Sequence, residues 1–172
     1  MLIPSLSFSL SLLAAALVLS SCAQKAMDVR TVHLGEKVQA GSLSYNAFDT
    51  QWLASLGEGA NSRLPVNRFF LVRVNIVNGG RSDATVPTLT LLDDSGQSYN
   101  EMTNGDGVPN WMGIVRKIRP ADSENGNIAF DVPPRHYRLR VGDESDERFA
   151  YVDIPLNFTI QTPAIPPASD RP

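Results

Sequence analysis

The sequence contains a single cysteine, Cys22, among 172 residues. With one thiol the chain can form no internal disulfide, so a folded domain must be held together by packing alone. The same count excludes the disulfide-bridged core of antibody domains and every metal or redox motif that needs a pair of cysteines. The position of this cysteine is informative, because it directly follows the most apolar part of the chain.

Charged side chains are absent from residues 1–21, which are rich in Leu, Ala, Val and Ser. The fully apolar part, Leu12 to Leu19, is too short to cross about 30 Å of hydrocarbon at ~1.5 Å per residue. Its length is typical of the central region of a secretory signal. Leu19-Ser20-Ser21-Cys22 resembles the bacterial lipobox. This resemblance implies cleavage before Cys22, attachment of a diacylglycerol to its thiol, and acylation of the new amine.

Lys and Arg are also absent from the first ten residues, although secretory signals normally carry them there. An ordinary secretory signal with an incidental cysteine, or a buried N-terminal helix, are the alternatives. The predicted organisation is a lipoprotein signal peptide over 1–21, a lipidated Cys22 and tether over 22–30, a domain over 31–160 and a Pro-rich tail over 161–172. The formal net charge of −3 argues against general binding to nucleic acid, which requires a basic surface.

Helical periodicity is lacking after the signal, where "QWLASLG" allows at most one helical turn. Apolar residues instead recur with a period of two, which indicates strands. In "RFFLVRVNIVN" the apolar face is Phe70, Val72, Val74 and Ile76. Similar alternation in "TLTLLD", "NIAFDV" and "YRLRV", separated by Gly, Pro and Asp turns, predicts an all-β, immunoglobulin-like β-sandwich of about seven to nine antiparallel strands.

The order of these pieces resembles the small immunoglobulin-like domain of the DUF4352 type. Three stretches carry the resemblance and together span Gly41 to Val141: "GSLSYNAFDT", "NRFFLVRVNIVNGGRSDATVPTLTLLDDSGQSY" and "IRPADSENGNIAFDVPPRHYRLRV". Arg119-Pro120-Ala121 lacks the glycine that is usual in the family's last turn. The resemblance implies an exported fold of the bacterial envelope, acting as an interaction module without an agreed biochemical activity.

Catalytic motifs are lacking. The two histidines, His33 and His136, are far apart in sequence, and no nucleophile elbow, zinc-protease helix or phosphate-binding glycine loop is present. We therefore expect no enzyme and no cofactor. An acidic stretch holds candidate Ca²⁺ ligands, but EF-hand spacing is absent and a solvated hairpin tip is the favoured interpretation. These candidate ligands are Asp143, Glu144, Asp146 and Glu147.

A basic group would face anionic lipid head groups if its strands were neighbours. Its members are Arg116, Lys117, Arg119, Arg135, Arg138 and Arg140. The long loop Thr103 to Val115 contains Trp111 and Met112. Either Trp111 closes one end of the sandwich as a lid, or the loop is a binding tip that Trp52 joins if the two loops share an end.

The function predicted first is a non-catalytic, lipid-anchored module that contacts an envelope protein outside the cytoplasm. In an organism with two membranes the outer one is favoured, because Ala23 and Gln24 lack the Asp that resembles an inner-membrane retention signal. The alternative from another class is a small-ligand or Ca²⁺ carrier that uses the sandwich loops. A purely structural envelope component is the third hypothesis.

Overall fold

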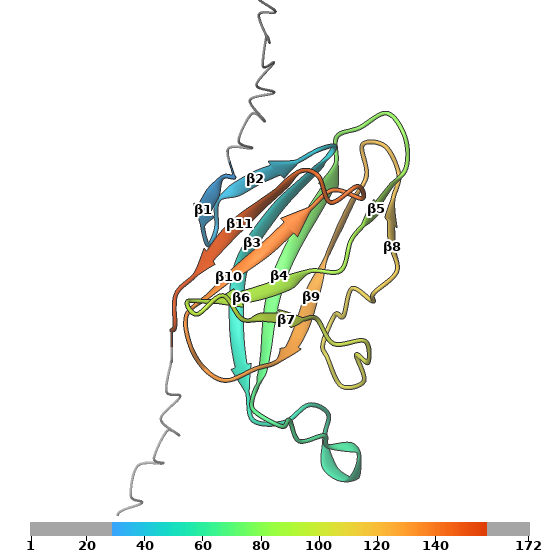
Figure 1. Cartoon of the computed structure of the whole chain (residues 1–172). Helices are drawn as coiled ribbons and strands as arrows, with labels where there is room; N and C mark the ends of the chain where they lie inside the picture. Colours follow the sequence, from blue (N-terminus) through green and yellow to red (C-terminus); the bar gives the residue numbers. More distant parts are fainter. Residues whose placement is uncertain (1–28, 158–172) are drawn as a thin grey trace, which may run out of the picture.

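Residues 29–157 of the computed structural model are described, and they fold into two facing β-sheets and a short ribbon (Figure 1). The predicted signal peptide, Cys22 and the Pro-rich tail lie outside the described residues. Within 29–157 no helix has the length and apolarity needed to cross a membrane.

The first sheet has the strand order β1-β11-β10-β6-β7. Its strands are β1 (Thr31–His33), β11 (Phe149–Ile154), β10 (Tyr137–Gly142), β6 (Thr90–Asp93) and β7 (Ser98–Asn100). All neighbours are antiparallel except β1, which runs parallel to β11. The turn between β6 and β7 contains the predicted "DDSG" motif, where Gly96 has a φ of 84°.

The second sheet has the order β2-β3-β4-β9 and is antiparallel throughout. Its strands are β2 (Lys37–Ala40), β3 (Leu43–Leu53), β4 (Phe69–Asn78) and β9 (Ser123–Asp131). A separate antiparallel ribbon joins β5 (Ala84–Val86) to β8 (Arg116–Ile118). β4 and its neighbours β3 and β9 carry the candidate site on their outer face.

The main core lies between the sheets and consists of the predicted alternating residues. Phe70, Val72, Val74 and Ile76 of β4 are at most 1% exposed. Ile128 and Phe130 of the adjacent strand β9 lie beside them, and Tyr137, Leu139 and Val141 of β10 belong to the opposite sheet; Val132, which follows β9, completes this part of the core. The predicted all-β sandwich is therefore confirmed, and it forms because a period of two places one face of every strand in the apolar interior.

A smaller apolar cluster lies on the opposite, outer face of the four-stranded sheet. Phe69 and Leu71 of β4 and Ala129 of β9 are buried there. The connections β3–β4 and β7–β8 cover them with Leu56 and Val108. The prediction missed this second layer because Leu71 belongs to the face of β4 that alternation assigned to solvent.

The number of strands differs from the prediction. The described residues contain eleven strands rather than seven to nine, because four of them (β1, β5, β7, β8) have only three residues. "QWLASLG", for which at most one helical turn was expected, contains none: it begins as the end of β3, and a 3₁₀ turn follows at Gly59–Asn61.

Candidate functional site

Polar side chains form rows across the outer face of the four-stranded sheet. Asp49, Arg73 and Asn127 are in register on β3, β4 and β9, and so project from the same face. The next row along the strands is Asn46, Asn75 and Asn125. On the other side of the first row lie Gln51, Leu71 and Ala129. Carboxamides therefore dominate this surface.

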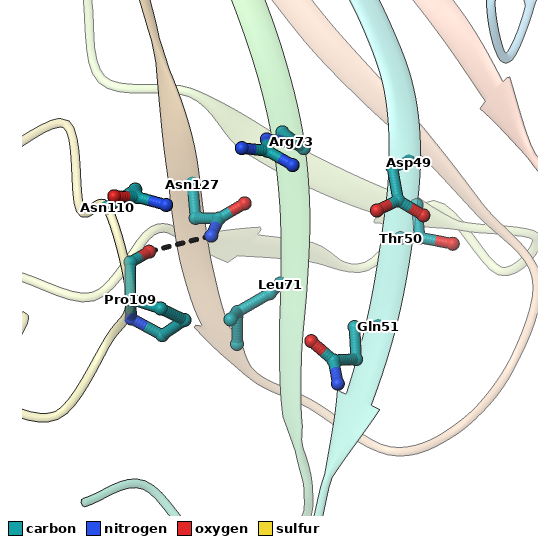
Figure 2. Close-up of a pocket in the computed structure, with 8 residues that line it drawn as sticks. All are labelled: Asp49, Thr50, Gln51, Leu71, Arg73, Pro109, Asn110 and Asn127. Atoms are coloured by element: carbon teal, nitrogen blue, oxygen red, sulfur yellow. Dashed lines mark hydrogen bonds between the residues drawn. The ribbon is translucent and has the colours of Figure 1, made fainter. Parts of the chain in front are cut away.

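A hollow of about 210 Å³ opens between these rows, and Figure 2 shows the polar side chains arranged around Leu71. Its lining residues come from β3, β4, β9 and the loop before β8: Asp49, Thr50, Gln51, Leu71, Arg73, Pro109, Asn110 and Asn127. Leu71 is 2% exposed and belongs to the outer apolar cluster. The hollow therefore combines an apolar residue with a polar rim.

Arg73 and Asp49 supply the charges of this rim. The Nε of Arg73 is buried and has no hydrogen-bond partner within residues 29–157. The guanidinium lies 5.9 Å from the ring centre of Phe48, and Figure 2 shows it directed toward β9. Among the described residues the Asp49 carboxylate forms neither an ion pair nor a hydrogen bond. Two charged groups of opposite sign thus stand beside each other with unused hydrogen-bonding capacity.

The loop that walls the hollow is held against the outer edge of β9. The backbone N–H of Asn127 donates to the Asn110 carbonyl at 2.8 Å, and the Met112 N–H donates to the Asn127 carbonyl at 3.2 Å. The Asn127 side-chain amide donates to the Pro109 carbonyl at 2.7 Å. Asn110 has a φ of 47°, a left-handed conformation that Asn tolerates better than most residues. The wall is therefore built into the sheet by backbone bonds.

The structure separates the three residues of the predicted interaction loop. Trp111 packs on the outer apolar cluster, whereas Met112 packs against the main core from the edge of β9. Trp52 stacks on Phe70 inside the sandwich, with ring centres 4.2 Å apart. Trp52 and Trp111 therefore lie on opposite faces of the sheet and are not brought together. Trp111 covers the outer face of the sheet, and not an end of the sandwich as the lid interpretation expected.

The acidic loop is a closed hairpin turn between β10 and β11. Asp143 accepts a hydrogen bond from the Ser145 hydroxyl at 2.8 Å, and Asp146 pairs with Arg140 at 2.6 Å. Glu144 and Glu147 are exposed. Between residues 29 and 157 no three His, Cys, Asp or Glu side chains form a group that could hold a metal ion.

The predicted basic group is not assembled. Arg116 is 1% exposed and pairs with buried Glu101, and its strand β8 lies beside β5 and not beside β10. Arg135 pairs with Asp93 at 2.7 Å, whereas Arg138 lies over the ring of Tyr151. The structural condition for a lipid-facing patch, that these strands be neighbours, is therefore not met.

His136 lies between two carboxylates at the end of the first sheet. Its Nδ1 is 2.7 Å from Asp94, and its Nε2 is 2.8 Å from Asp153. Hydrogen bonds to Asp94 and Asp153 raise the pKa of His136. Since both ring nitrogens are engaged, neither is available as a general base for a nucleophile. His33, 3.8 Å from Asp153, is exposed.

Sequence reasoning missed Asp49, Arg73 and Asn127. One signal was present in "RFFLVRVNIVN", where the outward positions Arg73 and Asn75 are polar within an otherwise apolar strand. The neighbours that complete the row belong to strands distant in sequence, and their register could not be read from composition.

The model of the DUF4352 family, a domain of unknown function, matches residues 32–148. No curated protein matches the chain. Among solved structures, YjhA of Bacillus subtilis is similar at a TM-score of 0.57 and 14% identity, over 72% of this chain and 98% of that one. YcdA of B. subtilis, a proposed lipoprotein, is similar at a TM-score of 0.56 and 15% identity, over 72% of this chain and 39% of that one. MPT63, a secreted protein of Mycobacterium tuberculosis, is similar at a TM-score of 0.54 and 15% identity, over 76% of this chain and 99% of that one.

Proposed function

Because the chain belongs to the DUF4352 family, we propose that it is a non-catalytic module, anchored outside the cytoplasm through lipid on Cys22, that binds another component of the cell envelope. The binding surface is the outer face of β3, β4 and β9, with the hollow at its centre. The anchor keeps this face close to the membrane, since residues 22–30 reach about 30 Å at most when extended.

Two kinds of support favour this location. Leu19-Ser20-Ser21-Cys22 resembles a lipobox, and the similar structures include a proposed lipoprotein and a secreted protein. Two or more acyl chains on one cysteine anchor a protein stably, whereas one chain does so only marginally. The outer membrane remains the favoured site in a cell with two membranes.

One observation carries the choice of surface. The hollow is rimmed by Asp49 and Arg73, whose hydrogen-bonding capacity is unused within the described residues, although Arg73 Nε is buried. A buried donor without an acceptor costs about 1–3 kcal/mol, and a ligand that accepts from it recovers this cost. The indole Nε1 of Trp111 is also buried without a hydrogen-bond partner among the described residues, but Trp111 packs on the outer apolar cluster and does not line the hollow. A carrier function fits less well, because 210 Å³ is below the roughly 300–1,000 Å³ of typical ligand pockets.

The proposal is tested by photo-crosslinking in the native host. A photoreactive amino acid replaces Gln51 on the rim of the hollow in the full-length chain, and replaces Gln97 in the β6–β7 turn of the other sheet as the control. Both positions are exposed. We expect adducts with envelope material from position 51 and none from position 97. Absence of adducts at 51, or equal adducts at both positions, contradicts the proposed binding face.

A further inference from the structure

We infer that the hollow binds a single sugar ring of an uncharged glycan, an inference that rests on the binding face proposed above. The chemistry of the rim, its charge, the size of the hollow and its surroundings on the sheet support this inference. It replaces the protein partner expected from the sequence with a polysaccharide.

The first step is the match between the hollow and a sugar ring. A pyranose presents C–H groups on its faces and hydroxyls around its edge. The hollow presents a ring of polar groups from three strands and one loop, with buried Leu71, 2% exposed, beneath them (Figure 2). A ring seated in the hollow is therefore held mainly by its hydroxyls, which reach the polar rim.

The second step is hydrogen-bonding capacity. The carboxamides of Gln51, Asn110 and Asn127 both donate and accept, the Asp49 carboxylate accepts, and the Arg73 guanidinium donates. A hydroxyl also does both, so neighbouring hydroxyls satisfy every member of this mixed set. A phosphate offers only acceptors and an ammonium only donors, and each would leave part of the rim unpaired. The buried Nε of Arg73 gains an acceptor from a sugar oxygen only when the side chain turns toward the hollow.

The third step is charge. Arg73 and Asp49 are in register on neighbouring strands, so their charges cancel locally. The other polar residues that line the hollow are neutral. An anionic polymer would meet one guanidinium and one repelling carboxylate, which gives no net attraction. The site therefore favours a neutral ligand.

The size of the hollow and the polar surface that continues beside it also fit a glycan. About 210 Å³ suits one ring-sized group rather than a drug-sized ligand. Asn75 and Asn125 continue the carboxamide surface beside the hollow, and Phe48, 39% exposed with the Arg73 guanidinium over its ring, lies at the edge. Neighbouring strands are ~4.8 Å apart, which is close to the length of one pyranose unit, so successive units of a chain meet successive strands.

The experiment is calorimetric titration of the full-length lipidated protein in a detergent without a sugar head group. The probes are hexamers of β-1,4-linked glucose, of β-1,4-linked N-acetylglucosamine and of galacturonic acid, the last as an anionic sugar of similar length. We expect at least one neutral hexamer to bind with a Kd on the order of 1 mM, because a single seated ring offers few atoms for affinity. The anionic hexamer should bind more weakly.

Two pairs of variants locate the site. Gln51→Ala and Asp49→Ala should each weaken binding about fivefold or more, as expected for loss of one or two hydrogen bonds. Gln97→Ala and Glu147→Ala likewise remove a carboxamide and a carboxylate, at exposed positions elsewhere, and should leave the Kd unchanged. Unchanged melting temperatures establish that all four variants are folded.

The outcomes separate the two proposals. Failure of both neutral hexamers to bind, preference for the anionic hexamer, or equal losses in rim and control variants overturns the glycan inference. Protein adducts from position 51 together with an absence of glycan binding would overturn it too, but would leave the proposed binding face standing. Absence of both adducts and glycan binding would overturn both.

Discussion

At the residue scale, protonation of the His136 imidazole is coupled to the stability of the fold. Its imidazole faces Asp94 in the β6–β7 turn and Asp153 on β11, while His33 on β1 also approaches Asp153, and the adjacent Arg135 pairs with Asp93. Hydrogen bonds to Asp94 and Asp153 raise the pKa of His136 above its usual 6.5. The protonated ring can donate to both carboxylates at once, whereas the neutral ring can donate to only one.

We therefore predict that stability decreases as the pH rises above about 6.5. A pKa that is higher in the folded state contributes stability fully below the unfolded value and loses it as the pH passes through the folded value. His136→Gln should flatten this part of the profile, which is measured by thermal unfolding between pH 6 and 9. His33→Gln, which leaves the bonds of His136 to Asp94 and Asp153 in place, should retain the slope. A wild-type profile that rises over this interval would contradict the assignment.

The buried ion pair Glu101–Arg116 is a second residue-scale determinant. Arg116 also donates from Nε to the Gly113 carbonyl at 2.6 Å, and Glu101 accepts from the Leu89 N–H at 2.8 Å. Through these bonds the pair ties β8 to the start of the β6–β7 hairpin. Burial raises the pKa of Glu101, and the charge of Arg116 opposes this rise.

Removal of Arg116 leaves a carboxyl group buried without its counter-charge. We predict that Arg116→Met lowers the free energy of unfolding by about 3–5 kcal/mol. The matched control is Lys117→Met, because Lys117 is 64% exposed in its pair with Asp83 and should contribute less than about 1 kcal/mol. Urea unfolding of both variants measures the difference. Similar losses in the two would show that burial of the pair is not what makes Arg116 important.

At the element scale, the loop Thr103 to Val115 protects an edge strand. β9 is the last strand of its sheet, and Asn110 to Met112 pair with Asn127 along the open side. An uncovered edge would offer its free N–H and C=O groups to other chains. Gly105 lets the loop close, since a Cβ at this position would lie 1.9 Å from the Trp111 ring. The long loop thus stabilises the fold by covering the edge of β9, and it also forms the wall of the hollow.

Trp111 should consequently contribute to stability. We predict that Trp111→Ala lowers the free energy of unfolding by about 3 kcal/mol, the lower end for an aromatic residue in a core, because the side chain is only partly buried. Val115→Ala, in the same loop but 88% exposed, should change it by no more than about 0.5 kcal/mol. Chemical denaturation measures both. An unchanged stability for Trp111→Ala would restore the binding-tip hypothesis.

At the scale of the whole molecule, the proposed anchor decides where the binding face acts. Cys22 lies outside the described residues, so the test is chemical. We predict that the wild-type protein enters the detergent phase and incorporates labelled fatty acid, and that Cys22→Ser abolishes the label. Loss of the thiol should not affect the sandwich, because Cys22 precedes the described domain. Equal labelling of the two proteins would exclude the lipobox interpretation.

The sequence by itself determined the strands and the inner core. In β4, β9 and β10 the period of two is a local property, and burial of the apolar face follows wherever strands pair. The turns after Asp93 and Asn78 are also specified by short stretches of sequence, because Gly and Asp favour the backbone angles of a turn without contacts from distant residues. For these elements a single stretch of sequence contains the whole physical cause.

The tertiary structure alone decided the candidate site. Leu43, Tyr45 and Ala47 point inward on β3, so simple alternation would turn Asp49 toward the core as well. The pairing with β4 shifts by one residue between Ala47 and Asp49. This bulge places Asp49 outward beside Arg73 and leaves Trp52 to stack inside. Register across strands distant in sequence depends on how the whole sheet pairs, so no local pattern could specify the hollow.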